Sequence, residues 1–131
     1  MPEGNASQRQ HADRPSARAR MEPVTEELLD RMVQLIVNAV NPERVILFGS
    51  QGRGDATPES DVDLVVIEAR PFDKTRSRLR EEARLYKALA SVRVRKDILV
   101  YSDDDVEYWK DSLNYVLARA LREGRVLYER P

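Results

Sequence analysis

The stretch over residues 45–67 constrains the fold of this chain most strongly. It reads VILFGS at positions 45–50, then ten polar or small residues, then DVDLVVI at positions 61–67. Each apolar run has the length of a β-strand, and the polar segment between the runs predicts a hairpin-like connection. The first run ends in Gly-Ser, and the second begins with two aspartates one residue apart.

The two aspartates predict a cation site. Side chains at positions i and i+2 of a strand project from the same face, so Asp61 and Asp63 are expected to lie side by side. Two neighbouring carboxylates repel each other unless cations lie between them. Mg²⁺ prefers oxygen ligands of this type and usually keeps phosphate oxygens and waters in its shell.

Gly49 and Ser50 predict an anion site next to those aspartates. They lie where a strand is expected to lead into a helix, and free backbone N–H groups at a helix start bind anions. Glycine also lets a phosphate approach the backbone closely. A phosphate site and a metal site joined by one connection together indicate a site for a nucleoside triphosphate.

Composition excludes several other functions. The 131 residues suffice for one domain, 34% of them are charged with both signs mixed, and the net charge is −1. A general nucleic-acid binder shows a clustered basic excess, so direct nucleic-acid binding is not expected. Because the chain has no cysteine and its one histidine is His11, thiolate sites and histidine-based catalysis are excluded. No apolar run approaches 18 residues, so no segment is expected to span a membrane. We expect a cytoplasmic protein.

The order of elements predicts an α/β (α+β) domain. Residues 1–22 are polar and basic without hydrophobic periodicity, which predicts a disordered tail, and residues 23–131 form the domain. Hydrophobic patterning and capping signals predict helices at 25–40, 71–90 (beginning near Asp73) and 102–124, and strands at 44–48, 62–67, 96–101 and 125–128. The charged side of the second helix, from Arg76 to Arg84, is expected to face solvent.

Asp97 is the candidate for a third carboxylate. It begins the strand at 96–101, within a run that is otherwise apolar, and a carboxylate there costs stability unless it is paired or bound to metal. If this strand neighbours the one at 62–67, Asp97 faces the same ions and can help to deprotonate an incoming hydroxyl. Two metal ions about 3.5–4 Å apart can stabilise both the attacking and the leaving oxygen. The alternative is a capped or salt-bridged acid at the strand edge.

The motif FGS at 48–50, followed by DVDL at 61–64, resembles the signature of nucleotidyltransferases of the DNA polymerase beta superfamily. The ten-residue spacer, the small size and the sequence GRVLYE at 124–129 resemble most closely the minimal nucleotidyltransferases, or MNT proteins. The resemblance covers about residues 24–130. It implies the nucleotidyltransferase (DNA polymerase beta-like) fold, a small mixed sheet flanked by helices, and it is more specific for the superfamily than for a substrate.

The resemblance also implies roles for individual residues. Gly49 and Ser50 would hold the triphosphate, and Asp61 and Asp63 would bind two Mg²⁺ ions. Asp97 would contact one of these ions and lie near the acceptor hydroxyl.

Arg53 is a further candidate for nucleotide binding. Many family members read Gly-Ser-Arg-Ala-Arg-Gly after the first strand, and here Gln51 and Gly52 replace the first Arg and the Ala, while Arg53 and Gly54 fit. Any charge contact from position 51 is therefore lost. Arg53 either reaches a phosphate or is an ordinary surface arginine.

MNT proteins are commonly encoded beside HEPN proteins, and in such systems the MNT protein transfers AMP from ATP to a tyrosine of the HEPN ribonuclease toxin. The resemblance therefore implies a protein adenylyltransferase and antitoxin, with a HEPN toxin as partner, in a homodimer or a hetero-oligomer. One alternative is a small-molecule nucleotidyltransferase, like the aminoglycoside-modifying enzymes. Another is a binding module that only masks the toxin. Template-directed polymerisation is disfavoured because no basic nucleic-acid-binding domain is attached.

Overall fold

The computed structural model of the protein describes residues 21–49, 61–112 and 115–131. The tail predicted at 1–22 falls mostly outside these residues, as do Ser50 and Arg53, so those interpretations stay predictions. The described elements are, in chain order, α2 (Glu26–Val40), β1 (Arg44–Phe48), β2 (Val62–Glu68), α4 (Arg78–Ala88), β3 (Lys96–Ser102), α5 (Asp103–Trp109), α6 (Val116–Glu123) and β4 (Arg125–Glu129).

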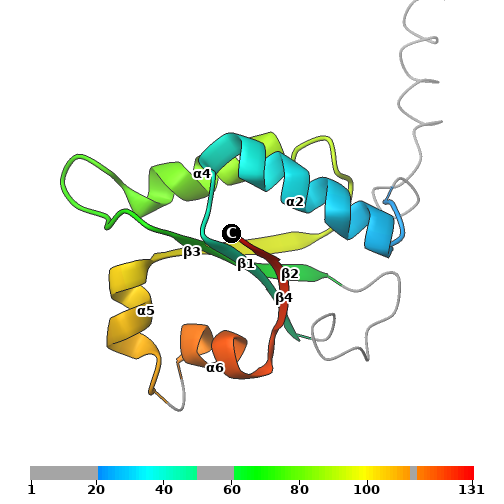
Figure 1. Ribbon diagram of the computed structural model, residues 1–131. Coiled ribbons are helices and arrows are strands. Elements are labelled where there is room, and N and C mark those ends of the chain that lie inside the picture. Colours follow the sequence, from blue (N-terminus) through cyan, green and yellow to red (C-terminus); the bar gives the residue numbers. More distant parts are fainter. Residues whose placement is uncertain (1–20, 50–60, 113–114) are drawn as a thin grey trace, which may run out of the picture.

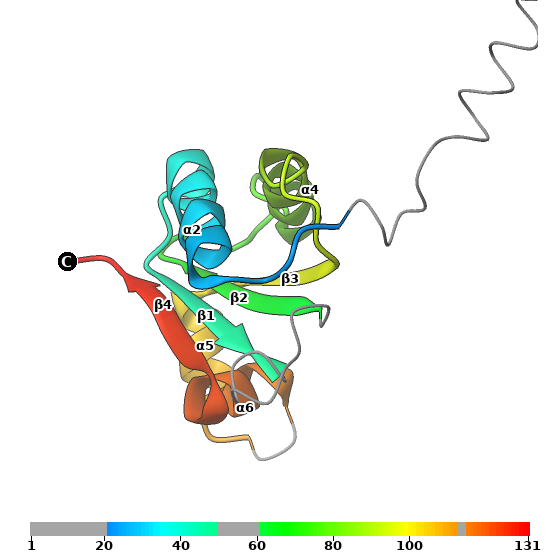
Figure 2. The ribbon, with the colours of Figure 1, turned by 90° about the vertical axis from the view of Figure 1, so that its right-hand side faces the viewer.

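The four described strands form one mixed sheet in the order β3-β2-β1-β4. Strand β1 runs antiparallel to both β2 and β4, whereas β2 and β3 are parallel. Helices α2 and α4 cover one face of the sheet, and α5 and α6 cover the other (Figures 1 and 2). The predicted small mixed sheet flanked by helices is therefore confirmed.

Strand β2 is buried on both faces, as its continuous apolar sequence predicts. Leu64 and Val66 pack into the cluster beneath α2 and α4, whereas Val65 and Ile67 pack into the cluster beneath α5 and α6. The alternation of side chains along a strand then places Asp63 on the same face as Val65. The carboxylate therefore belongs to the side of the sheet that α5 and α6 cover.

Helix α2 begins and ends as its sequence predicts. The side chain of Thr25 caps it by accepting a hydrogen bond from the backbone N–H of Leu28 (3.1 Å). Its apolar side is buried, with Met32 and Ile36 fully excluded from solvent. Asn41 ends the helix in a left-handed conformation (φ 47°), and so the chain turns back into β1.

The second helix differs from the prediction. It begins at Arg78, capped by Ser77, instead of near residue 73. Asp73 forms a local turn instead, because its Oδ1 accepts hydrogen bonds from the backbone N–H and the hydroxyl of Thr75 (both 2.8 Å). The buried residue of this helix is Leu85, whereas Leu79 is 76% exposed.

The long helix predicted over 102–124 is also wrong, because it is two helices. The capping box of Ser102 and Asp105 is confirmed at the start of α5. Helix α5 ends at Trp109, whose ring stacks on that of Tyr115 just before α6, with centroids 4.3 Å apart. Among the described helices, none combines the length and the apolar character needed to cross a membrane.

Candidate active site

A row of three side chains crosses the sheet on the face covered by α5 and α6. Phe48 of β1 is the register partner of Asp63 in β2, and Asp63 is the register partner of Asp97 in β3. Register partners on adjacent strands project from the same face, so the two carboxylates lie side by side. The prediction that these two strands are neighbours is confirmed, and the structure brings Asp97 to the aspartate pair.

The three aspartates form no ion pair with any basic side chain that the structure describes. Asp61 precedes β2 and is exposed, Asp63 is half-buried, and Asp97 is exposed. Burial raises the pKa of Asp63 above its usual range, and the negative charges of Asp97 and Asp61 raise it further. None of the ion pairs among the described residues involves these three carboxylates. Among the described residues, no basic side chain forms an ion pair that would stabilise the ionised form of the site.

Gly49 brings the backbone against this cluster. It follows β1 with φ +70°, a conformation that favours glycine, and a Cβ atom at this position would lie 2.6 Å from Oδ2 of Asp63. The glycine is thus required both by its conformation and by the close approach of the carboxylate. The first residue of the predicted phosphate site therefore adjoins the predicted metal site, while Ser50 and Arg53 lie beyond the described residues.

Tyr86 of α4 holds Asp97 in place. Its hydroxyl donates a hydrogen bond to Oδ1 of Asp97 (3.4 Å) and accepts one from the backbone N–H of Ile98 (2.9 Å). The sequence pattern did not single out Tyr86, and this contact was missed. No signal in the sequence reveals it, because the contact depends on how α4 packs beside β3.

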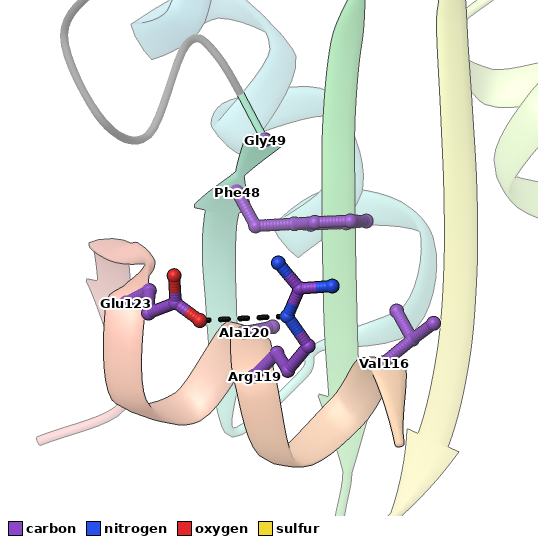
Figure 3. A pocket seen from close by; sticks show the side chains of 6 residues that line it. All are labelled: Phe48, Gly49, Val116, Arg119, Ala120 and Glu123. Carbon is purple, nitrogen blue, oxygen red and sulfur yellow. Dashed lines mark hydrogen bonds and ion pairs between the residues drawn. The ribbon is translucent and has the colours of Figure 1, made fainter. Parts of the chain in front are cut away.

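A hollow of about 190 Å³ opens beside Gly49 on the same face (Figure 3). Its wall on β1 is the ring of Phe48, and the facing wall comes from α6, where Val116 and Ala120 are apolar. Arg119 of α6 also lines the hollow and donates from Nε to Oε2 of Glu123 (3.5 Å). An apolar slot with a charged rim thus adjoins the bend at Gly49. The sequence interpretation missed it because α6 was merged into one longer helix.

The carboxylates fit Mg²⁺ that is shared with a phosphate ligand. Within residues 21–49, 61–112 and 115–131, no three acidic side chains come close enough to enclose a metal ion by themselves. Magnesium in nucleotide enzymes is commonly held by one or two carboxylates, with substrate phosphates and waters completing its shell. Carboxylates that have no ion-pair partner in the described part of the chain, beside the glycine bend, suit that arrangement better than a closed metal cage.

Comparisons with known proteins identify relatives over most of the chain. Residues 25–127 match the family described as "Nucleotidyltransferase domain". The chain is 31% identical over 106 residues to "Putative protein adenylyltransferase MJ0604" of Methanocaldococcus jannaschii, a match that covers 76% of this chain and 97% of that protein. A second protein of that organism, "Putative protein adenylyltransferase MJ0141", is 38% identical over 58 residues, which cover 44% of this chain and 54% of that protein.

A solved structure shares the fold, and a second is similar at a lower score. The crystal structure of a "putative nucleotidyltransferase" from Sulfolobus solfataricus matches with a TM-score of 0.57 and 18% identity, over 87% of this chain and 85% of that one. A toxin–antitoxin structure with AMP-PNP matches with a TM-score of 0.49 and 21% identity, over 82% of this chain and 75% of that one. Because the family match spans most of the chain and carries the strand, glycine and aspartate arrangement described above, the protein belongs to the nucleotidyltransferase domain family and is a nucleotidyltransferase.

Proposed function

We propose that the protein transfers AMP from ATP to a tyrosine hydroxyl of a partner protein, a HEPN ribonuclease toxin, and thereby silences that toxin. The observation that carries the proposal is the set of carboxylates beside the Gly49 bend that make no ion pair with the described residues. A protein acceptor is supported by the name of MJ0604, a relative similar over nearly its whole length. The toxin as acceptor rests on the resemblance to the minimal nucleotidyltransferases.

The residues of the site divide between phosphate and metal. Gly49 and Ser50, with Arg53, are proposed to hold the triphosphate, where the lack of a side chain at position 49 leaves backbone donors accessible. Asp61, Asp63 and Asp97 are proposed to hold two Mg²⁺ ions. When bound, these ions would neutralise the triphosphate and stabilise the charge that develops during transfer.

The transfer is an in-line displacement. The acceptor oxygen attacks the α-phosphorus of ATP, the bond to the oxygen bridging the α- and β-phosphorus breaks, and pyrophosphate leaves. Asp97 is the proposed acceptor of the hydroxyl proton, since it is exposed and lies on a strand at the end of the described sheet. An exposed base at such an edge is accessible to a residue carried by another protein.

The hollow beside Gly49 is proposed to hold the nucleoside. The ring of Phe48 offers a flat apolar surface on which a base can stack, and Arg119 lies at the rim of the hollow. Stacking on an aromatic ring contributes about 1–3 kcal/mol per base to the free energy of binding, and the contribution depends little on which base stacks. The choice between ATP and other nucleotides would then depend on polar contacts at the rim.

The direct test mixes the purified protein with ATP labelled at the α-phosphorus, Mg²⁺ and the protein encoded beside it. We expect label on the partner and release of pyrophosphate, both lost in Asp61→Asn and in Asp63→Asn. Asp30→Asn, which removes an exposed aspartate of α2, is the matched control and keeps the activity. Label that persists in both site variants contradicts the metal assignment. Label on an aminoglycoside and not on the protein indicates a small-molecule enzyme instead.

A further inference from the structure

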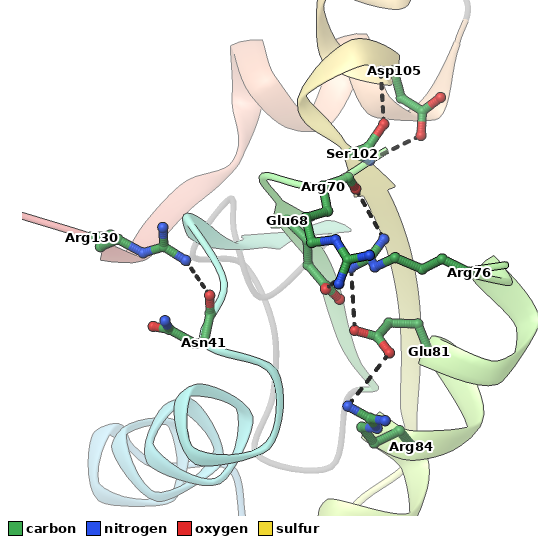
Figure 4. Close-up of polar contacts among 9 residues, drawn as sticks. All are labelled: Asn41, Glu68, Arg70, Arg76, Glu81, Arg84, Ser102, Asp105 and Arg130. Carbon is green, nitrogen blue, oxygen red and sulfur yellow. Dashed lines mark hydrogen bonds and ion pairs between the residues drawn. The ribbon is translucent and has the colours of Figure 1, made fainter. Parts of the chain in front are cut away.

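A second polar groove, of about 610 Å³, lies far from the aspartates. Its walls come from the end of α2, the end of β2 with the loop after it, the first turns of α4 and the C-terminal residues of the chain. Figure 4 shows the side chains that gather there. The charged ones among its lining residues are Glu68, Arg70, Arg76, Glu81, Arg84 and Arg130.

The groove and the candidate active site are separate. Glu68 lies five residues after Asp63 on β2, a separation of roughly 17 Å along an extended strand. The odd spacing also places the two side chains on opposite faces of the sheet. A ligand in the groove therefore cannot occupy the aspartate site as well.

A buried ion cluster forms the base of the groove. Arg76 pairs with Oε1 of Glu68 and lies 3.5 Å from Oε2 of Glu81, and these three side chains are 14%, 5% and 12% exposed. The guanidinium also donates to the carbonyl of Arg70 (2.9 Å) and stacks over the ring of Phe72. Arg76 is therefore fixed in position, and the prediction that this charged side of the helix faces solvent is wrong for Arg76 and Glu81.

Positive charge exceeds negative charge in the groove. Oε2 of Glu68 is buried and makes no hydrogen bond with the described residues. Burial, together with the neighbouring Glu81, raises the pKa of Glu68 to about 8, so this side chain is largely neutral at pH 7. Glu81 then offsets only one of the arginines.

The remaining arginines reach the groove from separate segments. Arg84 of α4 is 63% exposed and lies 3.9 Å from Glu81, whereas the side chain of Arg70 has no hydrogen bond or ion pair with the described residues. Arg130, from the C-terminal end, donates to the carbonyl of Asn41. Four guanidinium groups thus line one concavity, and they come from three segments: the connection between β2 and α4, helix α4 and the C-terminal end.

We infer that this groove binds a small phosphate-bearing ligand of about nucleotide size. Planar guanidinium groups match pairs of phosphate oxygens, and several together favour a dianion or polyphosphate. The volume lies within the range of about 300–1,000 Å³ that is usual for small-molecule sites. Convergence on one concavity favours such a ligand over an acidic protein segment, which would need basic groups spread along a strip.

The test titrates the full-length protein with inorganic phosphate, pyrophosphate and AMP in magnesium-free buffer and follows backbone amides by NMR. We expect shifts at Ala69, Arg70 and Thr75, with pyrophosphate or AMP binding more tightly than phosphate. Shifts confined to Gly49 and residues 61–63 overturn the inference, because they place the anion at the candidate active site.

Variants distinguish the groove from general charge attraction. The double variant Arg70→Gln/Arg84→Gln should weaken pyrophosphate binding by about tenfold or more, since two charge-assisted contacts are removed. The matched control Arg80→Gln/Arg93→Gln removes two exposed arginines that do not line the groove and should bind as the wild type does. An equal loss in both double variants overturns the inference, as does tighter binding of a hexaglutamate peptide than of pyrophosphate. Thermal unfolding of each variant verifies that it is folded.

Discussion

The acidic side chains at the two ends of β2 have opposite charged surroundings. At its start, Asp63 lies beside two further aspartates, and none of the three forms an ion pair with a described residue, whereas at its end the buried Glu68 is paired with Arg76. Burial is the leading cause of a raised pKa in both. Within the described residues, the first end thus has no cation paired with its carboxylates, whereas the second has Arg76 and further arginines around it. The net charge of −1 does not reveal that acidic groups gather at one end of β2 and basic groups at the other, because it sums the charges of the whole chain.

We call the start of β2, where Asp61, Asp63 and Asp97 gather, the uncompensated end, and the end at Glu68 the compensated end. The substitution Asp63→Asn tests the uncompensated end and should have the largest effect. We expect AMP transfer to fall about 1,000-fold, equivalent to about 4 kcal/mol of transition-state stabilisation. Burial and the other aspartates raise the pKa of Asp63, so its ionised form destabilises the metal-free fold. The free energy of unfolding of the metal-free protein therefore falls as pH rises through the folded-state pKa.

The same variant should therefore unfold at a higher temperature than the wild type at pH 7 without Mg²⁺. We expect a gain of roughly 1–4 °C, measured by circular dichroism, since about 1 kcal/mol moves the midpoint of a domain this size by about 4 °C. Asp30→Asn should change neither activity nor midpoint. A less stable Asp63→Asn protein would show that the carboxylate has a partner of its own and would remove the contrast between the two ends.

Arg76→Met tests the compensated end. Removing Arg76 leaves the carboxylate of Glu81 without its cation and the buried Oε1 of Glu68 without its hydrogen-bond donor, so we expect a loss of roughly 3 kcal/mol in the free energy of unfolding, measured with urea. Adding Glu81→Gln should restore part of that loss. Arg78→Met is the control, because its partner Asp105 is more exposed and the pair contributes less. Equal losses in Arg76→Met and Arg78→Met would show that burial does not distinguish these pairs.

Gly49→Ala tests the close approach of the backbone to Asp63. The added Cβ must displace the carboxylate, so we expect a roughly 30-fold loss of transfer, with a stability loss of about 1–2 kcal/mol from the positive φ. Asn41→Ala is the matched control, because Asn41 also has positive φ but ends α2 far from the aspartates. It should lose similar stability and keep its activity. A similar loss of activity in both variants would mean that backbone strain, and not the carboxylate, limits transfer.

Local signals in the sequence predicted the strands and the position of the aspartates well. Strand β1 has the predicted bounds, and β2, β3 and β4 each extend one residue further, because apolar alternation and the Gly-Ser and Asp-x-Asp motifs are short-range features. The register of Asp63 with Asp97 then follows once the two strands are neighbours. That pairing of strands was the only long-range assumption the site required.

Features that depend on packing between elements were not predictable in this way. The helix at 71–90 was placed too early because Asp73 and Thr75 form a turn that competes with helix formation. The helix at 102–124 was not divided because stacking of Trp109 on Tyr115 cannot be read from periodicity. The burial of Arg76 and the contact of Tyr86 with Asp97 follow from the packing of α4, and the sequence carries no local sign of either.

Glu68→Gln isolates the titration of the compensated end. The pKa of Glu68 is raised to about 8 in the folded state, so between its ordinary value and pH 8 the folded protein binds more protons than the unfolded chain, and stability falls as pH rises. Between pH 5.5 and 7.5 we expect the wild type to lose on the order of 1 kcal/mol more than the glutamine variant, measured by urea unfolding. Parallel pH profiles would mean that Glu68 is ionised in the folded protein and fully compensated by Arg76.

The substitution Tyr86→Phe should have the smallest effect. It measures how much the hydrogen bond from Tyr86 contributes to the position of Asp97 at the uncompensated end. The change removes the hydrogen bond to Asp97 and the one accepted from Ile98, while the ring stays, so we expect a two- to fivefold lower kcat, in line with about 0.5–1 kcal/mol for one hydrogen bond. KM for ATP should stay unchanged, because the hydroxyl positions the carboxylate nearest the acceptor and does not contact the nucleotide. Tyr108→Phe, on a side chain 77% exposed, makes the same chemical change without that contact and should match the wild type. An unchanged kcat in Tyr86→Phe would mean that Asp97 is oriented by metal and substrate alone, and the uncompensated end would then depend on its ligands for geometry as well as for charge.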